Sequence, residues 1–297
     1  MQTELRKMKT YHIIFNPTAG KKGALKSLKI TEEVFSSRGV KFQTHLSHAE
    51  RDATDIARML TEAGETEIVT IGGDGTLHEV LNGLADPTAC HLGLIPSGTG
   101  NDFAEKIALP LDAEKAASLI LDGVTMETDY LEVGGVRCMN VAGVGMDVDV
   151  LERCKKGKMK GKIKYLLSLL QSLFAFKGYN VEFEKDGIKE THDVLLAAAC
   201  NGSQFGGGIP ICPEAIVDDG KIHAVVVDCI GGKMKIIKAF LQLMKGKILE
   251  YPATTHFLCD SVKFTTKFPC TLQLDGELYK GIPFDVKICK GLQFYRM

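Results

Sequence analysis

Short apolar runs rich in β-forming residues alternate with amphipathic helical patterns over residues 1–125, and this alternation constrains the fold more than any other feature. The apolar runs cover residues 11–15, 67–71 and 92–95, and residues 41–46 are a further strand candidate. After residues 41–46, Ala53, Ile56, Ala57 and Leu60 fall on one face of a helix. Strands that alternate with helices pair in parallel, because each crossover helix returns the chain to the same edge of the sheet. We therefore expect an α/β domain with a mainly parallel sheet over residues 1–127.

The pattern changes near residue 128. Residues 179–185, the turn Asp186-Gly187 and residues 188–192 predict a hairpin. Helical patterns occur at 162–176 and 233–247, and further short strands are expected at 194–200, 222–230, 261–266, 271–274 and 282–288. Residues 128–297 therefore predict a mainly antiparallel domain, a β-sandwich or a flattened barrel.

Composition and charge narrow the class of protein. Hydrophobic residues make up 45% of the 297, and the net charge of −1 provides no general attraction to nucleic acid. No apolar stretch reaches the roughly 20 residues that span a bilayer, and residues 1–9 lack a secretory core, so we expect a cytoplasmic protein. Nine cysteines without a CxxC pair argue against a disulfide framework and against a zinc site.

A glycine-rich segment, Gly72-Gly73-Asp74-Gly75-Thr76, lies where the third strand ends and a helix begins. Ligands of open α/β sheets bind at the carboxyl ends of strands, and glycines let backbone N–H groups approach phosphate oxygens. An acid in such a loop repels phosphate unless a divalent cation lies between them, so Asp74 suggests magnesium. The alternative is a glycine turn in which Asp74 caps the helix.

Two further loops belong to the same set. Residues 16–20 follow the first strand and residues 96–104 follow the fourth. Either could be a plain turn, but adjacent parallel strands would bring all three loops into one crevice. The dinucleotide-binding GxGxxG and the Walker GxxxxGK[ST] spacings are absent, which disfavours dehydrogenases and P-loop enzymes.

With these motifs, NPTAG, GGDGT and IPSGTGNDFA, the chain resembles the diacylglycerol kinase catalytic family, specifically the small soluble bacterial-type lipid kinases, which are also similar to sphingosine kinases. Residues 213–222 and 274–277 match as well, so the resemblance spans nearly the whole chain. It implies an α/β domain like those of NAD kinases and phosphofructokinases, followed by a β-sandwich domain. The implied activity is transfer of the ATP γ-phosphate to a lipid hydroxyl, with diacylglycerol as the leading acceptor and phosphatidic acid as the product.

The resemblance also implies site residues. It assigns Glu277 as proton acceptor with Asp275 beside it, and it counts Asp74 with the catalytic acids. A structural magnesium would be held by Asp219 and by the backbone carbonyls of Ile216 and Lys221. The ATP site would be lined by Asn16, Pro17, Thr18, Ala19, Gly20, Ser47, Gly72, Gly73, Asp74, Gly75, Thr76, Leu77, His78 and Thr99.

Plainer interpretations of the acidic motifs stay open. Asp218-Asp219-Gly220 also fits an acidic β-turn, and Asp275-Gly276 also fits a hairpin turn with a solvated Glu277. In the catalytic interpretation ATP and magnesium lie in a cleft between the domains, and a carboxylate accepts the proton of the acceptor hydroxyl.

Membrane contact is expected because the substrate is a membrane lipid. Six lysines between residues 155 and 164 lead into a helical pattern that ends at residue 176, which fits peripheral attachment to anionic lipid. The same segment also fits a buried helix that covers the β domain. Residues 204–209 are a candidate acceptor pocket. We expect no nucleic-acid partner, and a homodimer could form through an edge strand.

The sequence leaves two alternative functions open. An NAD kinase is favoured by GGDGT and opposed by the NDFA segment after Gly100. A catalytically inactive lipid-binding protein is opposed by the intact Asp74, Asp219, Asp275 and Glu277.

Overall fold

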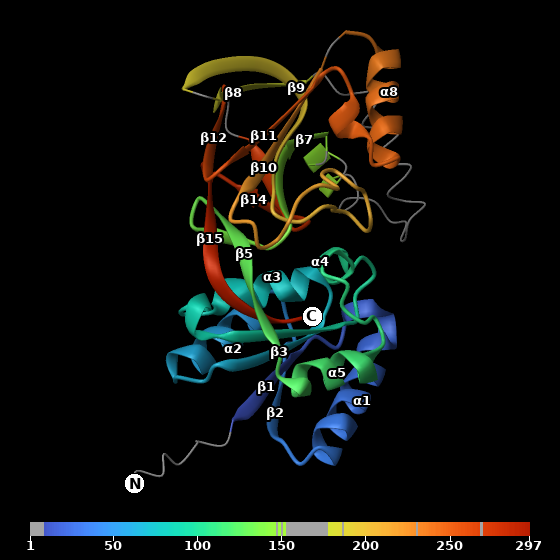
Figure 1. Ribbon diagram of the computed structural model, residues 1–297, viewed down its shortest axis with the longest axis vertical. Coiled ribbons are helices and arrows are strands. Elements are labelled where there is room, and N and C mark those ends of the chain that lie inside the picture. The colour runs from blue at the N-terminus through green and yellow to red at the C-terminus, as the bar shows by residue number, and fades with distance from the viewer. Residues whose placement is uncertain are drawn as a thin grey trace. The chain divides into compact units, whose positions relative to one another are not determined.

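The computed structural model describes residues 9–297 except 147, 150, 153–177, 186, 230, 268 and 269. The chain forms two compact units, coloured along the sequence in Figure 1. The first contains Met1–Thr128 and Lys290–Met297, and the second contains Asp129–Cys289. The sequence placed all of 128–297 in the second domain, which is wrong for the last residues. Strand β15 (Phe284–Tyr295) returns to the first unit, where Gln293 lies opposite His91 in parallel pairing.

The first unit contains a parallel sheet in the order β15-β4-β3-β1-β2. The strands are β1 (Thr10–Phe15), β2 (Lys41–Leu46), β3 (Glu67–Gly72) and β4 (His91–Pro96), and their registers are parallel throughout. Every residue of β3 is buried, as expected for a central strand with both faces covered. The predicted parallel α/β architecture is confirmed.

Helices cover the two faces of this sheet in contacting pairs, α1 with α5 and α2 with α3 (Figure 1). Their apolar stripes supply the buried residues, for example Ala53, Ala57 and Leu60 of α2. The helical segments of the unit are η1 (Ala19–Lys22), α1 (Gly23–Ser37), α2 (Asp52–Glu62), α3 (Asp74–Gly83), η2 (Pro87–Ala89), α4 (Asp102–Lys106) and α5 (Ala113–Asp122).

The second unit is built from antiparallel strands in the order β14-β13-β7-β9-β8-β12-β15. Strand β10 pairs with β9 on one side and with β11 on the other. Strand β5 (Thr125–Val133) leads into the unit and pairs with β6 (Val136–Cys138). The other strands are β7 (Val141–Gly145), β8 (Tyr179–Lys185), β9 (Ile188–Cys200), β10 (Ile222–Asp228), β11 (Thr254–Cys259), β12 (Ser261–Thr266), β13 (Thr271–Leu274) and β14 (Glu277–Lys280). The predicted antiparallel β-sandwich is confirmed.

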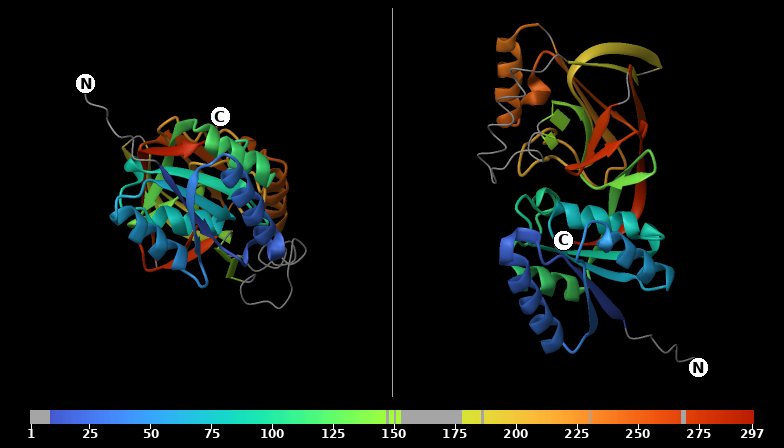
Figure 2. Two further views of the ribbon diagram at one scale, coloured as in Figure 1. Left: turned by 90° about the horizontal axis from the view of Figure 1, so that it is seen from below. Right: turned by 180° about the vertical axis from the view of Figure 1, so that it is seen from behind.

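Strand β10 and the second half of β9, residues 194–200, are buried, which explains their near-continuous apolar sequence. On one face Ala198 and Val225 pack with helix α8 (Lys233–Met244), which Figure 2 shows in orange beside the sheet, and with η3 (Ile248–Glu250). On the other face Ala199 and Val226 pack with residues of β12, β13 and β15. The alternation follows from the two-residue period of a strand.

Several strands differ from their sequence predictions. The expected strands 188–192 and 194–200 are one long strand, β9, and strands β5, β6, β7, β11 and β14 were not predicted. The helix expected at 162–176 lies outside the described residues. In the described part of the chain, none of the helices has the length and apolar character that a membrane span requires.

Candidate active site

Four parallel strands of the first unit end at one edge of the sheet. Phe15 lies beside Ile71 and Leu46 in the register, and Gly72 lies beside Pro96. The loops that follow β1, β3 and β4 therefore start side by side, together with Ser47 after β2. Parallel strands with crossover helices impose this arrangement.

Backbone hydrogen bonds connect these loops to one another. Ser97 N–H donates to the carbonyl of Gly72 at 2.8 Å, and Asn16 N–H donates to the carbonyl of Ile71 at 3.2 Å. The Asn16 side chain reaches Thr76, with Nδ2 3.4 Å from Oγ1. The loops thus form one continuous backbone surface.

Two glycine positions are dictated by close approach of these backbones. A Cβ added at Gly98 would lie 2.5 Å from the Cα of Gly73, and one at Gly20 would lie 2.0 Å from the carbonyl oxygen of Ser97. Gly20 also has a φ of +58°, in the left-handed region. No side chain fits at either position without moving a loop.

Asp74 joins two of the loops. It is the first residue of α3, but its carboxylate accepts the backbone N–H groups of Asp102 and Phe103, each at 3.1 Å. These N–H groups begin α4, so the charge lies at the N-terminus of that helix. The capping role anticipated as an alternative is therefore present at the neighbouring helix, α4.

The other residues assigned to nucleotide binding are distributed around the same edge. Ser47 is buried and donates its N–H to the Phe15 carbonyl at 2.9 Å. Thr18 donates both N–H and Oγ1–H to Asn16 Oδ1, at 2.9 and 2.7 Å, which folds the turn that holds Pro17 and Ala19. Thr99 is exposed.

The first turn of α3 holds Gly75, Thr76, Leu77 and His78. The last three are buried, and His78 is only 2% exposed. This turn therefore offers a ligand chiefly the backbone N–H groups of its first residues, which precede the first helical hydrogen bond, from Leu77 N–H to the Gly73 carbonyl at 3.0 Å.

In the second unit, the hairpin of β13 and β14 carries the two acids assigned to catalysis. Asp275 and Gly276 form a two-residue turn with φ of +52° and +85°, as in a type I′ turn, and Leu274 pairs with Glu277 across it. Glu277 is the first residue of β14 and is half-buried. The hairpin-turn interpretation of Asp275-Gly276 is therefore correct as a description of the backbone.

Asp275 holds a neighbouring segment in place. Its carboxylate accepts the backbone N–H groups of Met139 and Asn140, both at 2.7 Å, and the Cys138 thiol at 3.1 Å. Burial, and then the Asp275 charge, raise the pKa of the Cys138 thiol well above its usual value. These contacts engage both carboxylate oxygens of Asp275 with backbone N–H groups and with the thiol.

The acidic turn at 218–220 is anchored by Asp129, a buried acid that the sequence did not single out because it belongs to no motif. Asp129 Oδ2 accepts Gly220 N–H at 2.7 Å, and Asp129 N–H donates to the Val217 carbonyl at 2.6 Å. Asp219 Oδ1 accepts Lys221 N–H at 2.9 Å. A carboxylate with the nearby carbonyls of Ile216 and Lys221 is the all-oxygen donor type that suits magnesium.

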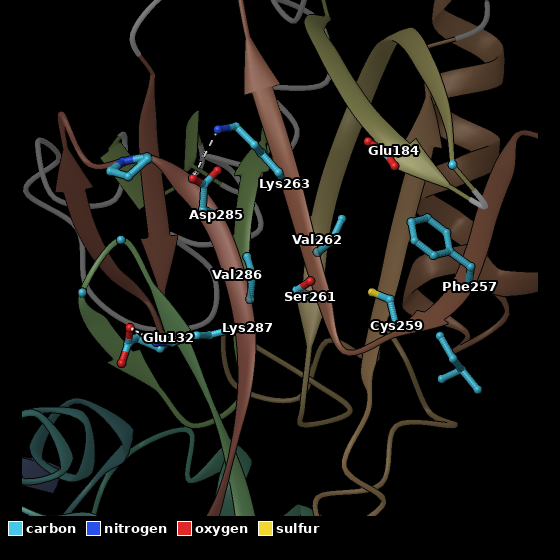
Figure 3. Close-up of a pocket in the computed structure, with 15 residues that line it drawn as sticks. Glu132, Glu184, Phe257, Cys259, Ser261, Val262, Lys263, Asp285, Val286 and Lys287 are labelled. Atoms are coloured by element: carbon cyan, nitrogen blue, oxygen red, sulfur yellow. Dashed lines mark hydrogen bonds and ion pairs between the residues drawn. The ribbon is translucent and has the colours of Figure 1, made fainter.

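Residues 204–209, the expected acceptor pocket, form a tight loop. Phe205 and Ile209 are buried and bridge each other, and Gly206, Gly207 and Gly208 all have positive φ. A separate hollow of about 690 Å³ lies against β11, β12 and β15, with the Lys263–Asp285 ion pair in its wall (Figure 3). None of the residues assigned to the site from the sequence lines this hollow.

Comparisons with known proteins agree along the whole chain. The family model for the diacylglycerol kinase catalytic domain matches residues 10–133, and the model for the YegS C-terminal NAD kinase beta sandwich-like domain matches residues 140–292. A diacylglycerol kinase of Bacillus subtilis (strain 168) is 30% identical over 93% of this chain and 91% of its own length. A probable lipid kinase YegS-like of Xanthomonas campestris pv. campestris is 31% identical over 87% of both chains.

A solved structure supports the fold. The crystal structure of a diacylglycerol kinase from Bacillus anthracis str. Sterne superposes with a TM-score of 0.75 at 22% identity, covering 98% of this chain and 97% of its own. The matched families, the near-complete coverage and the shared architecture lead to one assignment. The chain belongs to the lipid kinase family that has a diacylglycerol kinase catalytic domain and a YegS-type C-terminal domain.

Proposed function

We propose that this kinase transfers the γ-phosphate of ATP to the free hydroxyl of diacylglycerol and releases phosphatidic acid. The observation that best supports ATP binding is the close packing of the glycine loops at Gly20, Gly73 and Gly98. With no side chains between them, backbone N–H groups at the start of α3 can approach phosphate oxygens. Helix dipoles favour the negative charge of a polyphosphate at the same place.

Magnesium is the divalent ion that this proposal includes. One magnesium ion, bound together with ATP, would neutralise charge on the phosphates during transfer. Asp219 and the carbonyls of Ile216 and Lys221 would hold a structural ion, and their oxygen donors fit it. Asp74 would keep the α3 and α4 loops together around the nucleotide, through its bonds to Asp102 and Phe103.

Glu277 would accept the proton of the lipid hydroxyl. At the same time the hydroxyl oxygen would bond to the γ-phosphorus and ADP would leave. Its position directly after a rigid two-residue turn supports this role, because a short type I′ hairpin fixes the direction of the next side chain. Asp275 would act indirectly, by holding the Met139 and Asn140 backbone against the same turn.

Diacylglycerol is proposed as the acceptor because the Bacillus subtilis relative that carries this name aligns over almost the entire chain. The YegS-like relative aligns nearly as fully, so other lipid alcohols belong in the same assay. Sphingoid bases, ceramide, polyprenols and phosphatidylglycerol complete the panel, and NAD tests the NAD kinase alternative.

The test is transfer of radiolabelled γ-phosphate from ATP with magnesium to diacylglycerol dispersed in mixed micelles, with products separated by thin-layer chromatography. We expect labelled phosphatidic acid, and Glu277→Gln should lower kcat by about 10²- to 10⁴-fold, the usual contribution of a general base. Glu184→Gln is the matched control, because Glu184 is an exposed carboxylate beside the β8–β9 turn of the same unit. Absence of transfer to every lipid, with Asp74→Ala equal to wild type, would overturn the proposal, and transfer to NAD would replace it.

We also propose peripheral membrane contact through α8. Met234, Leu241 and Met244 of this helix are 67%, 50% and 46% exposed, and Lys233, Lys235 and Lys238 are exposed beside them. Exposed apolar side chains flanked by lysines suit an anionic lipid surface. The segment 155–176, on which the sequence prediction rested, lies outside the described residues. Homodimerisation through an edge strand stays a prediction.

A further inference from the structure

Three side chains with metal-binding atoms meet in the second unit, and none of the three was assigned to the nucleotide, magnesium or catalytic site. The ligand atoms of Cys212, His223 and His256 all lie within 4.8 Å of one another. The two imidazoles stack, and His223 Nδ1 is 3.1 Å from His256 Nε2.

Strand register produces this cluster. His223 of β10 lies opposite Cys200 of β9, and His256 of β11 lies opposite Val225, two residues further along β10. Residues 223 and 225 share a face, so Cys200, His223 and His256 project to the same side of three adjacent strands. Cys212 lies in the loop that precedes β10, and its side chain packs against this face in the core, beside Cys200.

We propose that Cys212, His223 and His256 form a binding site for a thiophilic divalent metal ion, with Zn²⁺ as the best match. Zinc bonds of about 2.3 Å to sulfur and about 2.0–2.1 Å to nitrogen place tetrahedral ligand atoms about 3.3–3.7 Å apart. The cluster already approaches these separations. Cys200, whose thiol hydrogen-bonds Cys212, lies beside the cluster, and its sulfur would have to move closer to the imidazoles to become the fourth ligand.

The second nitrogen of each imidazole faces a carboxylate, which strengthens the metal interpretation. His223 Nε2 is 3.4 Å from Asp219 Oδ2, and His256 Nδ1 is 3.9 Å from Glu214 Oε2. Metal-binding histidines commonly direct their remaining N–H to a carboxylate, which fixes the tautomer and the ring orientation. With a metal bound, protons on His223 Nε2 and His256 Nδ1 would leave His223 Nδ1 and His256 Nε2 as the ligand atoms.

The surroundings also suit a tightly held ion. Cys212 is fully buried, the His223 side chain is 5% exposed, and the His256 side chain is 21% exposed and offers a route for the ion. The hydrogen bond from Cys200 lowers the pKa of the Cys212 thiol, and contacts with His223 and His256 add to this effect against the opposing influence of burial. The thiolate is the form of cysteine that binds metals.

This site differs from the magnesium site proposed at Asp219. Sulfur and imidazole donors select zinc-like ions, whereas magnesium takes oxygen donors. The proposal therefore holds whether or not the chain phosphorylates diacylglycerol. Spacing along the sequence argued against a zinc site, and the register of β9, β10 and β11 brings together residues that this spacing keeps apart.

The experiment measures metal content and ligand type in the full-length protein. Protein from zinc-supplemented cells is dialysed against metal-free buffer and its zinc is measured by inductively coupled plasma mass spectrometry. We expect about one zinc per chain, as for a structural site with one ion. After replacement by Co²⁺, a thiolate-to-cobalt charge-transfer band should appear in the near ultraviolet. Cys212→Ser should abolish this band and reduce zinc to background.

Cys259→Ser is the matched control, since Cys259 lies on β11 near His256 but outside the cluster. It should keep both the zinc and the cobalt band. Because Cys212 is buried, a second variant separates loss of a ligand from loss of the fold. His256→Gln changes the most exposed of the three side chains, and circular dichroism verifies that it is folded.

Added zinc should raise the Tm of metal-free wild type and leave that of His256→Gln unchanged, because only a native-state site stabilises on binding. Wild type with no more zinc than Cys212→Ser, or a cobalt spectrum without the thiolate band, would refute the site. The same conclusion would follow from a folded His256→Gln protein with full zinc content. The cluster would then be a hydrogen-bonded thiol–imidazole network.

Discussion

Replacement of Gly98 by alanine gives the sharpest test of the nucleotide loops. The added Cβ would lie 2.5 Å from Gly73 Cα and 2.7 Å from Asn101 Oδ1. Carbon atoms in good contact lie about 3.5–4.0 Å apart, so the two loops must separate by about 1 Å. Gly98 does not have a positive φ, and the effect is therefore steric rather than conformational.

The size of the effect follows from this displacement. Forcing one extra carbon into close-packed structure costs about 1–3 kcal/mol. A shift of about 1 Å in groups that position a substrate can lower the rate by about 10²-fold. We therefore expect Gly98→Ala to raise the Kd for a non-hydrolysable ATP analogue by at least tenfold and to lower kcat/KM for ATP by about 10- to 100-fold.

The assay combines calorimetric titration of the ATP analogue with initial rates at saturating lipid. Gly23→Ala is the matched control, because a Cβ at Gly23 meets no atom within 4 Å and its φ is −62°. Alanine there should leave ATP binding unchanged and add up to about 1 kcal/mol of helix stability. Thermal unfolding verifies that both variants are folded. If Gly98→Ala binds the analogue as wild type does, the loops do not form a nucleotide cradle.

Three further predictions concern the second unit. Asp275→Asn should lower the free energy of unfolding by about 1–3 kcal/mol in urea titrations, because the buried N–H groups of the 139–141 segment lose a charged acceptor. Burial alone lowers the pKa of His192, but hydrogen bonds to Asp228 and Glu190, at 2.7 and 3.0 Å, raise it overall. The stability that these bonds add is fully present below about pH 6.5 and is lost as pH rises through the raised pKa, so the deficit of His192→Gln should shrink with rising pH. Reversal of Lys233 and Lys235 to Glu should weaken binding to anionic vesicles by about thirtyfold or more in sedimentation assays, at about 1 kcal/mol for each lysine lost.

Each of these has its own control. Asp285→Asn changes an acid in an exposed pair with Lys263 and should cost well under 1 kcal/mol. A pH-independent deficit in His192→Gln would show that the imidazole contributes by packing rather than by charge. Reversal of Lys263 and Lys287, exposed on β12 and β15, should leave vesicle binding close to wild type, and equal loss in both pairs of variants would remove α8 as the membrane contact.

The local patterns of the sequence were sufficient for the architecture. Strands β2, β12 and β13 have the predicted bounds, and the Asp275-Gly276 turn was anticipated from its dipeptide. The unpredicted strand β11 lacks a strong signal because it begins just after Pro252 and alternates weakly in burial. Strand β15 proved longer than expected, since its second half is stabilised by pairing with β4.

The sequence alone determined the two-part fold, the edge at which the glycine loops gather and the chemical class of the chain, because these signals arise within a few neighbouring residues. Only the tertiary structure decided what the acids contact. Asp74 caps a helix 28 residues away, and Asp275 holds a segment 135 residues before it. The tertiary structure also decided that Cys212, His223 and His256 meet. The distances between their side chains depend on strand register and loop packing, and the spacing of residues along the chain predicts neither.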